Sequence, residues 1–273
     1  FYANSGNSLA FAADADGNAF FATPPLEPVL KQHVVKINSN GERIDLRNLE
    51  YNSIFAADVD NKNRLNLLTD EGIVRLNHDG SITLVPIRIE ARESLNMRNF
   101  TAGQKLWYVI TTDYNEKIEV FSIDELGTVK FLPISFGRDS FGTEVYKVSD
   151  AGIDVAPDGS IALIAAAIGS ASQGPLLQRV YRADSDGSNL KEIARLDVPR
   201  VAGLVDIAVR PDNKVFVFAS QGDSDPIHRI DENNKVTEAI HICTGHDPKS
   251  IDVDSAGNIW FSTTIGIFKA AIR

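Results

Sequence analysis

The stretch Ile251-Asp-Val-Asp-Ser-Ala-Gly-Asn-Ile-Trp-Phe-Ser-Thr263 predicts a strand, a tight turn and a second strand. Its central glycine supplies the positive φ that a hairpin turn needs, and the residues on either side are β-branched or aromatic, as strands prefer. The segment Phe11–Thr23 matches it position for position, with Gly17-Asn18 over Gly257-Asn258. Because the two copies lie at opposite ends of the chain, the hairpin is the unit of an internal repeat.

Four further segments repeat the same hairpin between these two. They are Phe55–Leu68, Arg98–Ile110, Ile153–Ile164 and Ile207–Phe218. A second series of turns alternates with the six hairpins, at Asn40-Gly41, Asp79-Gly80, Leu126-Gly127, Asp186-Gly187 and Asn233-Asn234. The segments around this second series alternate polar and apolar residues, which is typical of strands further from the core.

The count of hairpins predicts the architecture. Six inner hairpins and five outer ones leave single strands at the two ends of the chain, in 266–273 and in 1–5. The mean period of 273/6, about 45 residues, fits the four strands of a propeller blade. We therefore predict one all-β domain over 1–273, a six-bladed β-propeller with four antiparallel strands per blade. The N-terminal strand is expected to close the ring by pairing with the C-terminal blade, with Tyr2 and Phe268 in one sheet; seven blades or a β-sandwich are the alternatives.

Composition excludes several classes of protein. The single cysteine, Cys243, allows no intrachain disulfide and no cysteine-rich zinc site. The longest apolar run, Ile161–Ile168, is far shorter than the ~20 residues of a membrane span. A net charge of −10 opposes nucleic acid or an anionic membrane as partner. The chain starts at Phe1, which suggests either a removed leader or a trimmed chain. A removed leader would favour a secreted or periplasmic protein, although one cysteine suits the cytosol equally.

Two segments resemble known propeller families. Pro248–Thr263 is similar to the blade unit of NHL-repeat and virginiamycin B lyase-like propellers, and Ala156-Pro-Asp-Gly-Ser160 resembles the TolB-type repeat. Gluconolactonase-like members of this superfamily hold a divalent cation at the central channel, using an early Glu and later Asn and Asp residues. This chain has no Glu before Glu27, so it departs from that pattern. The residues left to form a partial oxygen cage for Ca²⁺ are Asn52, Asn99, Asp150 and Asp206.

The candidate binding residues are those in loops that enter the inner strand or leave the second strand of a blade. Loops on one rim of a rigid ring commonly carry function. His246 is the best catalytic candidate, since a histidine can act as base or ligand, but no Glu follows it as the lyase resemblance would require. An acidic residue beside an aromatic one suits a sugar or a cation, and three arginines could meet an anion. The full set is Arg98, Asp113, Tyr114, Arg138, Arg200, His246 and Asp247.

Two functions from different classes remain open at this point. The sequence has no Gly-x-Ser-x-Gly motif, no phosphate-binding glycine loop and no His-x-x-x-His pair. The first hypothesis is therefore a propeller that binds a small molecule, a carbohydrate or a protein on its loop face near the central channel. The second is a divalent-cation-dependent lactonase, esterase-type hydrolase or lyase, with Ca²⁺ as its cofactor. The sequence does not decide whether the protein is an enzyme.

Overall fold

The computed structural model describes residues 10–23, 31–87, 96–103, 105–112, 118–136, 148–167, 176–198, 205–219, 226–242, 248–254, 256–263 and 266–271. Every regular element in these ranges is a β-strand. The strands are β1 (Phe11–Ala13), β2 (Ala19–Ala22), β3 (Gln32–Ile37), β4 (Arg43–Tyr51), β5 (Ile54–Val59), β6 (Leu65–Thr69), β7 (Gly72–Leu76), β8 (Ile82–Val85), β9 (Asn96–Ala102), β10 (Trp107–Thr112), β11 (Ile118–Ile123), β12 (Val129–Phe131), β13 (Val148–Val155), β14 (Ile161–Ala167), β15 (Leu176–Ala183), β16 (Lys191–Val198), β17 (Val205–Val209), β18 (Val215–Ala219), β19 (Ile227–Ile230), β20 (Val236–Ile240), β21 (Pro248–Val253), β22 (Ile259–Thr263) and β23 (Gly266–Ala270).

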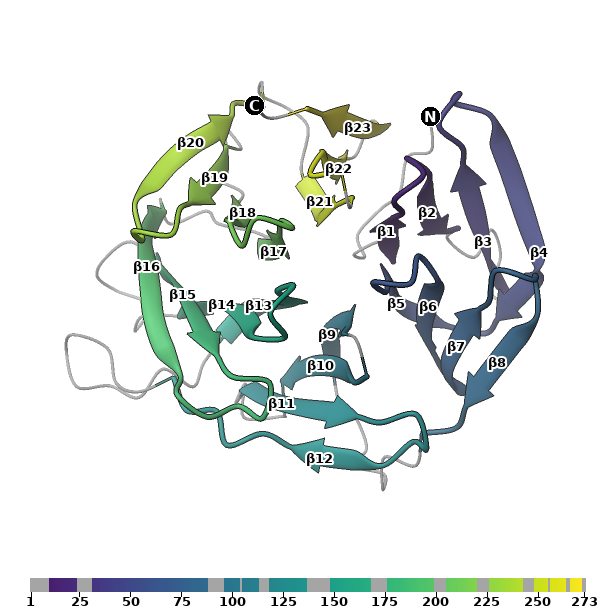
Figure 1. Ribbon diagram of the computed structural model, residues 1–273, viewed down its shortest axis with the longest axis horizontal. Coiled ribbons are helices and arrows are strands. Elements are labelled where there is room, and N and C mark those ends of the chain that lie inside the picture. Colours follow the sequence, from purple (N-terminus) through teal and green to yellow (C-terminus); the bar gives the residue numbers. More distant parts are fainter. Residues whose placement is uncertain are drawn as a thin grey trace.

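The strands form six antiparallel sheets arranged as a ring, which confirms the six-bladed propeller (Figure 1). Blades 1 to 5 are β1–β4, β5–β8, β9–β12, β13–β16 and β17–β20, and blade 6 has the described strands β21–β23. The innermost strand of every blade is its first in the sequence, so β1, β5, β9, β13, β17 and β21 surround the central axis. Both predicted series of hairpin turns connect strands as expected.

The ring closes between blade 6 and blade 1. The backbone N–H of Ala13 in β1 donates to Asp252 Oδ2 in β21 at 2.6 Å, and Trp260 of β22 packs against Phe11 and Phe21. Residues 1–9 lie outside the described residues, so the predicted strand pairing of Tyr2 beside Phe268 stays a prediction. The contacts of blade 6 with β1 and β2 of blade 1 already join the two blades without this strand pairing.

The apolar core consists of six clusters, one at each junction between successive blades. Side chains alternate across a strand, so neighbouring residues of the same strand face different junctions. In β10, Trp107 and Val109 face blade 2, whereas Tyr108 and Ile110 face blade 4. This explains why the inner hairpins have nearly continuous apolar sequences: both faces of each sheet are buried. No helix among these residues is long and apolar enough to cross a membrane.

Turn chemistry fixes the inner hairpins. Gly17 and Gly257 adopt φ of 78° and 80°, which is the left-handed region that glycine occupies without steric cost. The aspartate that begins each of these two turns accepts hydrogen bonds from the turn, as Asp14 Oδ1 does from the N–H of Asn18 at 2.8 Å. The innermost strands therefore end at a defined height, and the turns surround one end of the channel.

Candidate functional site

A cavity of about 370 Å³ lies where the innermost strands end and their hairpin turns begin. Its lining comes from all six blades, so it sits on the propeller axis. A second cavity of about 30 Å³ lies further along the channel. Asp58, Thr101, Asp154 and Asp252 line both cavities and therefore separate them.

Three of these four residues are carboxyl groups at equivalent positions of the repeat. Asp58, Asp154 and Asp252 each precede the last residue of the innermost strand of blades 2, 4 and 6. Blades 1, 3 and 5 place Ala12, Thr101 and Ala208 at the corresponding position. Because the blades repeat around one axis, equivalent positions lie at the same height, and the three carboxyl groups converge. We call them the axial aspartates.

Each axial aspartate connects its own blade to the next one. Asp58 Oδ2 accepts the N–H of Ala102, Asp154 Oδ2 that of Val209, and Asp252 Oδ2 that of Ala13, all at 2.6 Å. The other oxygen of each carboxyl accepts the N–H of the following residue, at 2.6–2.7 Å. The axial aspartates thus link three alternate blade junctions around the channel.

No basic side chain is paired with any axial aspartate in the described ranges. Desolvation inside the ring raises the pKa of Asp58 to about 6, against the opposing hydrogen bonds from Ala102, Thr101 and Val59. Desolvation, together with the charge of Asp58, raises the pKa of Asp154 to about 8. The pKa of Asp252 is also raised, by desolvation first and then by Asp58 and Asp154. Protons therefore remain on this cluster near neutral pH.

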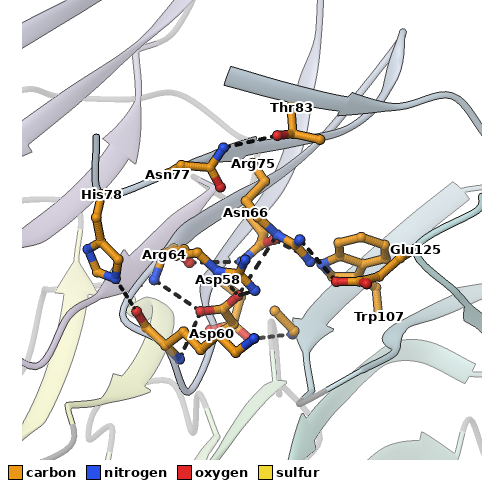
Figure 2. Close-up of polar contacts among 12 residues, drawn as sticks. Asp58, Asp60, Arg64, Asn66, Arg75, Asn77, His78, Thr83, Trp107 and Glu125 are labelled. Carbon is orange, nitrogen blue, oxygen red and sulfur yellow. Dashed lines mark hydrogen bonds and ion pairs between the residues drawn. The ribbon is translucent and has the colours of Figure 1, made fainter. Parts of the chain in front are cut away.

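Asp60, which lines the larger cavity, has basic partners, and Figure 2 shows its contacts with the side chains around it. Asp60 Oδ2 accepts the Nε–H of Arg64 at 2.9 Å and lies 3.9 Å from Arg75 Nε. Arg75 also donates to Asn66 Oδ1 at 3.1 Å, and its guanidinium carbon lies 4.7 Å from the centre of the Trp107 ring. Trp107 completes the network by donating to Asn66 Oδ1 at 3.0 Å. The carboxylate of Asp60 is thus neutralised by two guanidinium groups.

Blade 6 repeats this arrangement with different residues. Lys269 Nζ lies 3.2 Å from Asp254 Oδ2 and 4.7 Å from the centre of the Trp260 ring. Trp260 Nε1 donates to the same oxygen at 3.0 Å. Desolvation raises the pKa of Asp254, but hydrogen bonds from Asn258, Trp260 and Lys269 outweigh it, and the pKa is lowered. The cavity therefore has carboxyl groups with basic partners on its wall and carboxyl groups with a raised pKa on its axis.

Most of the binding residues predicted from sequence lie outside the described residues. These are Asp113, Tyr114, Arg138, Arg200, His246 and Asp247, and they stay predictions. Arg98 is placed on β9, with its side chain outside the description.

The structure places the predicted calcium ligands Asn52 and Asp206 in different surroundings. Asn52 is exposed and donates to Asp70 Oδ2 at 2.9 Å. Asp206 is buried, lines the smaller cavity, and accepts the hydroxyl of Ser250 and the N–H of Ile251 at 2.8 and 3.0 Å. Asn99 and Asp150 lie on β9 and β13, with side chains outside the description. Within the described ranges no group of three or more His, Cys, Asp or Glu side chains, the axial aspartates included, could hold a metal ion, and a calcium site stays a prediction.

Sequence reasoning missed the axial aspartates, although a signal for them was present. Aligning the six inner hairpins places Asp58, Asp154 and Asp252 in one column, in every second copy. The residues predicted from sequence lie instead in the loops that enter the inner strands or leave the second strands. A polar residue repeated within an otherwise apolar inner strand is the signal that identifies this position.

The comparisons with known proteins concern the fold. No protein family model matches the sequence, and no curated protein matches it. Virginiamycin B lyase from Staphylococcus aureus is 11% identical, with 100% of this chain and 98% of that chain covered and a TM-score of 0.55. A gluconolactonase from Xanthomonas campestris is 10% identical over 99% and 97% of the two chains, with a TM-score of 0.57. The Aleuria aurantia lectin in complex with Fucα1-6GlcNAc is 10% identical over 97% and 95%, with a TM-score of 0.59.

These likenesses confirm the expected resemblance to lyase-like and gluconolactonase-like propellers at the level of fold. The chain spans nearly the whole length of each of the three proteins. Propellers of one shape host unrelated activities, so function has to be argued from the site.

Proposed function

We propose that the protein is a ligand-binding propeller whose larger axial cavity holds a small polyhydroxylated molecule, a carbohydrate in class. The observation that carries the proposal is the convergence of three carboxyl groups on the floor of a 370 Å³ cavity. Ligand sites typically measure about 300–1,000 Å³ and combine apolar walls with a few convergent polar groups. The likeness to a lectin that binds a fucosylated disaccharide is consistent with this class of ligand.

The chemistry of the lining supports a sugar over an anion. The carboxyl oxygens of the floor and of Asp60 and Asp254 accept hydrogen bonds, which sugar hydroxyls donate. The small apolar residues between them, such as Val155 and Pro157, offer surface for the C–H faces of a sugar ring. No lysine or arginine lines this cavity in the described ranges, so an anionic ligand would find no counter-charge.

This proposal places the ligand at the end of the channel where the hairpin turns lie. The sequence predicted a ligand on the opposite rim, formed by the loops that enter the inner strands. Most of those loops lie outside the described residues, so binding at that rim stays a separate prediction.

The test is a binding measurement with a variant that fills the cavity without touching the axial aspartates. Ala15 is exposed and lines the cavity, so Ala15→Trp should obstruct it, whereas Ala15→Ser should not. We expect saturation-transfer NMR with a panel of mono- and disaccharides to show binding to the wild type and to Ala15→Ser, and to lose it in Ala15→Trp. Absence of binding by any saccharide, or equal binding by both variants, contradicts the proposal.

The second candidate is the divalent-cation-dependent hydrolase or lyase. The observation that favours it is buried Asp206 on the wall of the smaller cavity, at the channel position where the sequence predicted a cation. A cation that binds only the native state stabilises it by about 4 kcal/mol at 1,000 times its dissociation constant. A rise in Tm with Ca²⁺ that EDTA reverses, together with lactone hydrolysis, would favour this function over simple ligand binding.

A further inference from the structure

The hydroxyl of Thr101 lies between two axial aspartates. Its Oγ1 is 2.8 Å from Asp58 Oδ2 and 2.9 Å from Asp154 Oδ1. A threonine hydroxyl has one proton and can donate to only one acceptor at a time. If both carboxyls were ionised, the hydroxyl would satisfy one and turn its lone pairs toward the other.

A proton on one carboxyl completes the arrangement. A neutral carboxyl donates its O–H to Thr101 Oγ1, and Thr101 donates to the ionised carboxyl on the other side. The backbone N–H groups of Ala102 and Val155 already donate to the same two carboxyl oxygens, at 2.6 and 2.7 Å. One proton shared between the two carboxyls would make both short contacts of the Thr101 hydroxyl hydrogen bonds.

We propose that Asp58, Thr101 and Asp154 form a proton bridge across the channel, which holds blades 2 to 5 together while the proton is bound and weakens when the proton leaves. The bridge reaches four blades because Asp58 also accepts the N–H of Ala102 in blade 3, and Asp154 that of Val209 in blade 5. Loss of the proton leaves two carboxylates facing one hydroxyl.

The titratable side chains that line the two cavities are all aspartates in the described ranges. Asp252 completes the floor, Asp60 and Asp254 line the larger cavity, and Asp206 lines the smaller one. Three arginines of the neighbouring turns and strands have other partners: Arg64 and Arg75 lie against Asp60, and Arg210, which follows β17, lies 3.5 Å from Asp212. The charge of Asp60 raises the pKa of Asp58, and the charge of Asp58 raises that of Asp154, so these neighbouring carboxylates favour retention of the proton.

The sign of the pH dependence follows from the raised pKa of both carboxyls. Groups whose pKa is higher in the folded state contribute stability that is full at pH below about 4 and is lost as the pH rises through 6 and 8. His228 acts in the opposite sense, because burial lowers its pKa and its contribution is lost as the pH falls below about 6.5. Because His228 is present in the wild type and in each variant, its contribution cancels in the difference between their pH slopes.

The first experiment measures Tm between pH 5.5 and 8.5. We expect the Tm of the wild type to fall by roughly 5–10 °C over this range. In Asp154→Asn the amide N–H can replace the bound proton, so the slope should shrink by more than half, whatever the absolute Tm. The matched control is Asp45→Asn, a partly exposed aspartate on β4 that lies outside the channel, and its slope should match the wild type. An unchanged slope in Asp154→Asn overturns the proposal.

The second experiment observes the proton directly and does not depend on the folding of Asp154→Asn. In protein labelled with ¹³C at the aspartate carboxyls, we expect a resonance that titrates above pH 6. Its midpoint should move in Thr101→Val and return in Thr101→Ser, which restores the hydroxyl. If every aspartate carboxyl titrates below pH 5, or if Val and Ser at position 101 behave alike, the bridge does not exist.

Discussion

Asp58 and Asp60 lie two residues apart at the end of β5, yet their surroundings differ completely. Asp60 lies against two guanidinium groups, whereas Asp58 meets backbone N–H groups, the hydroxyl of Thr101 and other carboxyls. Asp254 and Asp252 repeat the contrast in blade 6, with Lys269 beside the former only. Side chains at the cavity wall thus have balanced charge, and those on the axis do not.

The difference arises from the space around the axis. Long basic side chains reach Asp60 and Asp254 from strands further out in their own blades, as Arg75 does from β7 and Lys269 from β23. The axial positions next to the carboxyls hold Ala12, Thr101 and Ala208, which are too short to bring a cation. The wall residues therefore form ion pairs, whereas the axial aspartates lie close to one another without a basic partner in the described ranges.

Removal of the balanced carboxylate should have the largest effect on stability. Asp60→Ala removes the counter-charge of Arg64 in a largely enclosed site and leaves Arg75 with its ion pair to Glu125. Breaking such a pair by removing one partner costs about 3–5 kcal/mol. Urea denaturation should show this loss, and Asp60→Asn should lose less because an acceptor oxygen remains. A loss below about 1 kcal/mol for Asp60→Ala would contradict the idea that ion pairs on the cavity wall stabilise the protein more than the axial aspartates do.

Removal of an axial carboxyl should cost less, and the cost should depend on pH. Asp252→Asn keeps one acceptor and loses the other, so we expect a loss of about 1–2 kcal/mol at pH 5.5. At pH 8.5 the loss should be smaller, because the substitution also removes one of three repelling charges. Urea midpoints at the two pH values check this. A loss that grows with pH would show that Asp252 is favoured as a carboxylate.

The cation over Trp260 should contribute less than the pair of arginines at Asp60. Lys269→Met removes the ion pair with Asp254 and the contact with the indole face, but the Lys269 side chain is 40% exposed. We expect a loss of about 1 kcal/mol at low salt, reduced at high salt by screening. The lowered pKa of Asp254 should also rise in this variant, although Asn258 and Trp260 still donate to it. No response to salt would mean that the lysine acts by packing alone.

An ion pair on the outer strands should matter least. Arg43 and Asp45 are paired at 2.8 Å in β4, with about a third of each side chain exposed. Solvent-exposed pairs contribute a median of about 0–1 kcal/mol. Asp45→Asn should therefore change the free energy of unfolding by no more than about 0.5 kcal/mol. This variant sets the background against which the three preceding substitutions are compared.

Much of the fold was predictable because it depends on local signals. The glycine and asparagine turns fix each hairpin, and the apolar runs require burial on both faces of a sheet, as at Trp107 and Tyr108. Six copies of one hairpin and five of another then leave the propeller as the simplest closed arrangement. The closing N-terminal strand and the loop residues around His246 lie outside the described residues and stay predictions.

The candidate site was less accessible from sequence. Asp58, Asp154 and Asp252 are separated by about a third of the chain, and each alone resembles an ordinary polar residue near a turn. Their equivalent positions in the aligned hairpins indicate that they lie at the same height along the propeller axis. The alignment does not show in which direction their carboxyl groups point or which residues face them. The partners of Asp60 posed the same difficulty, since Arg75 approaches from another strand.

The sequence by itself determined the number of blades, the hairpins and the alternation of aspartate with alanine or threonine along the repeat, because turn geometry and burial act over a few residues. Only the tertiary structure decided that these aspartates meet around one axis, that Thr101 stands between two of them, and that no basic group in the described ranges is paired with them. Charge interactions depend on distance in space, and the closed ring sets those distances.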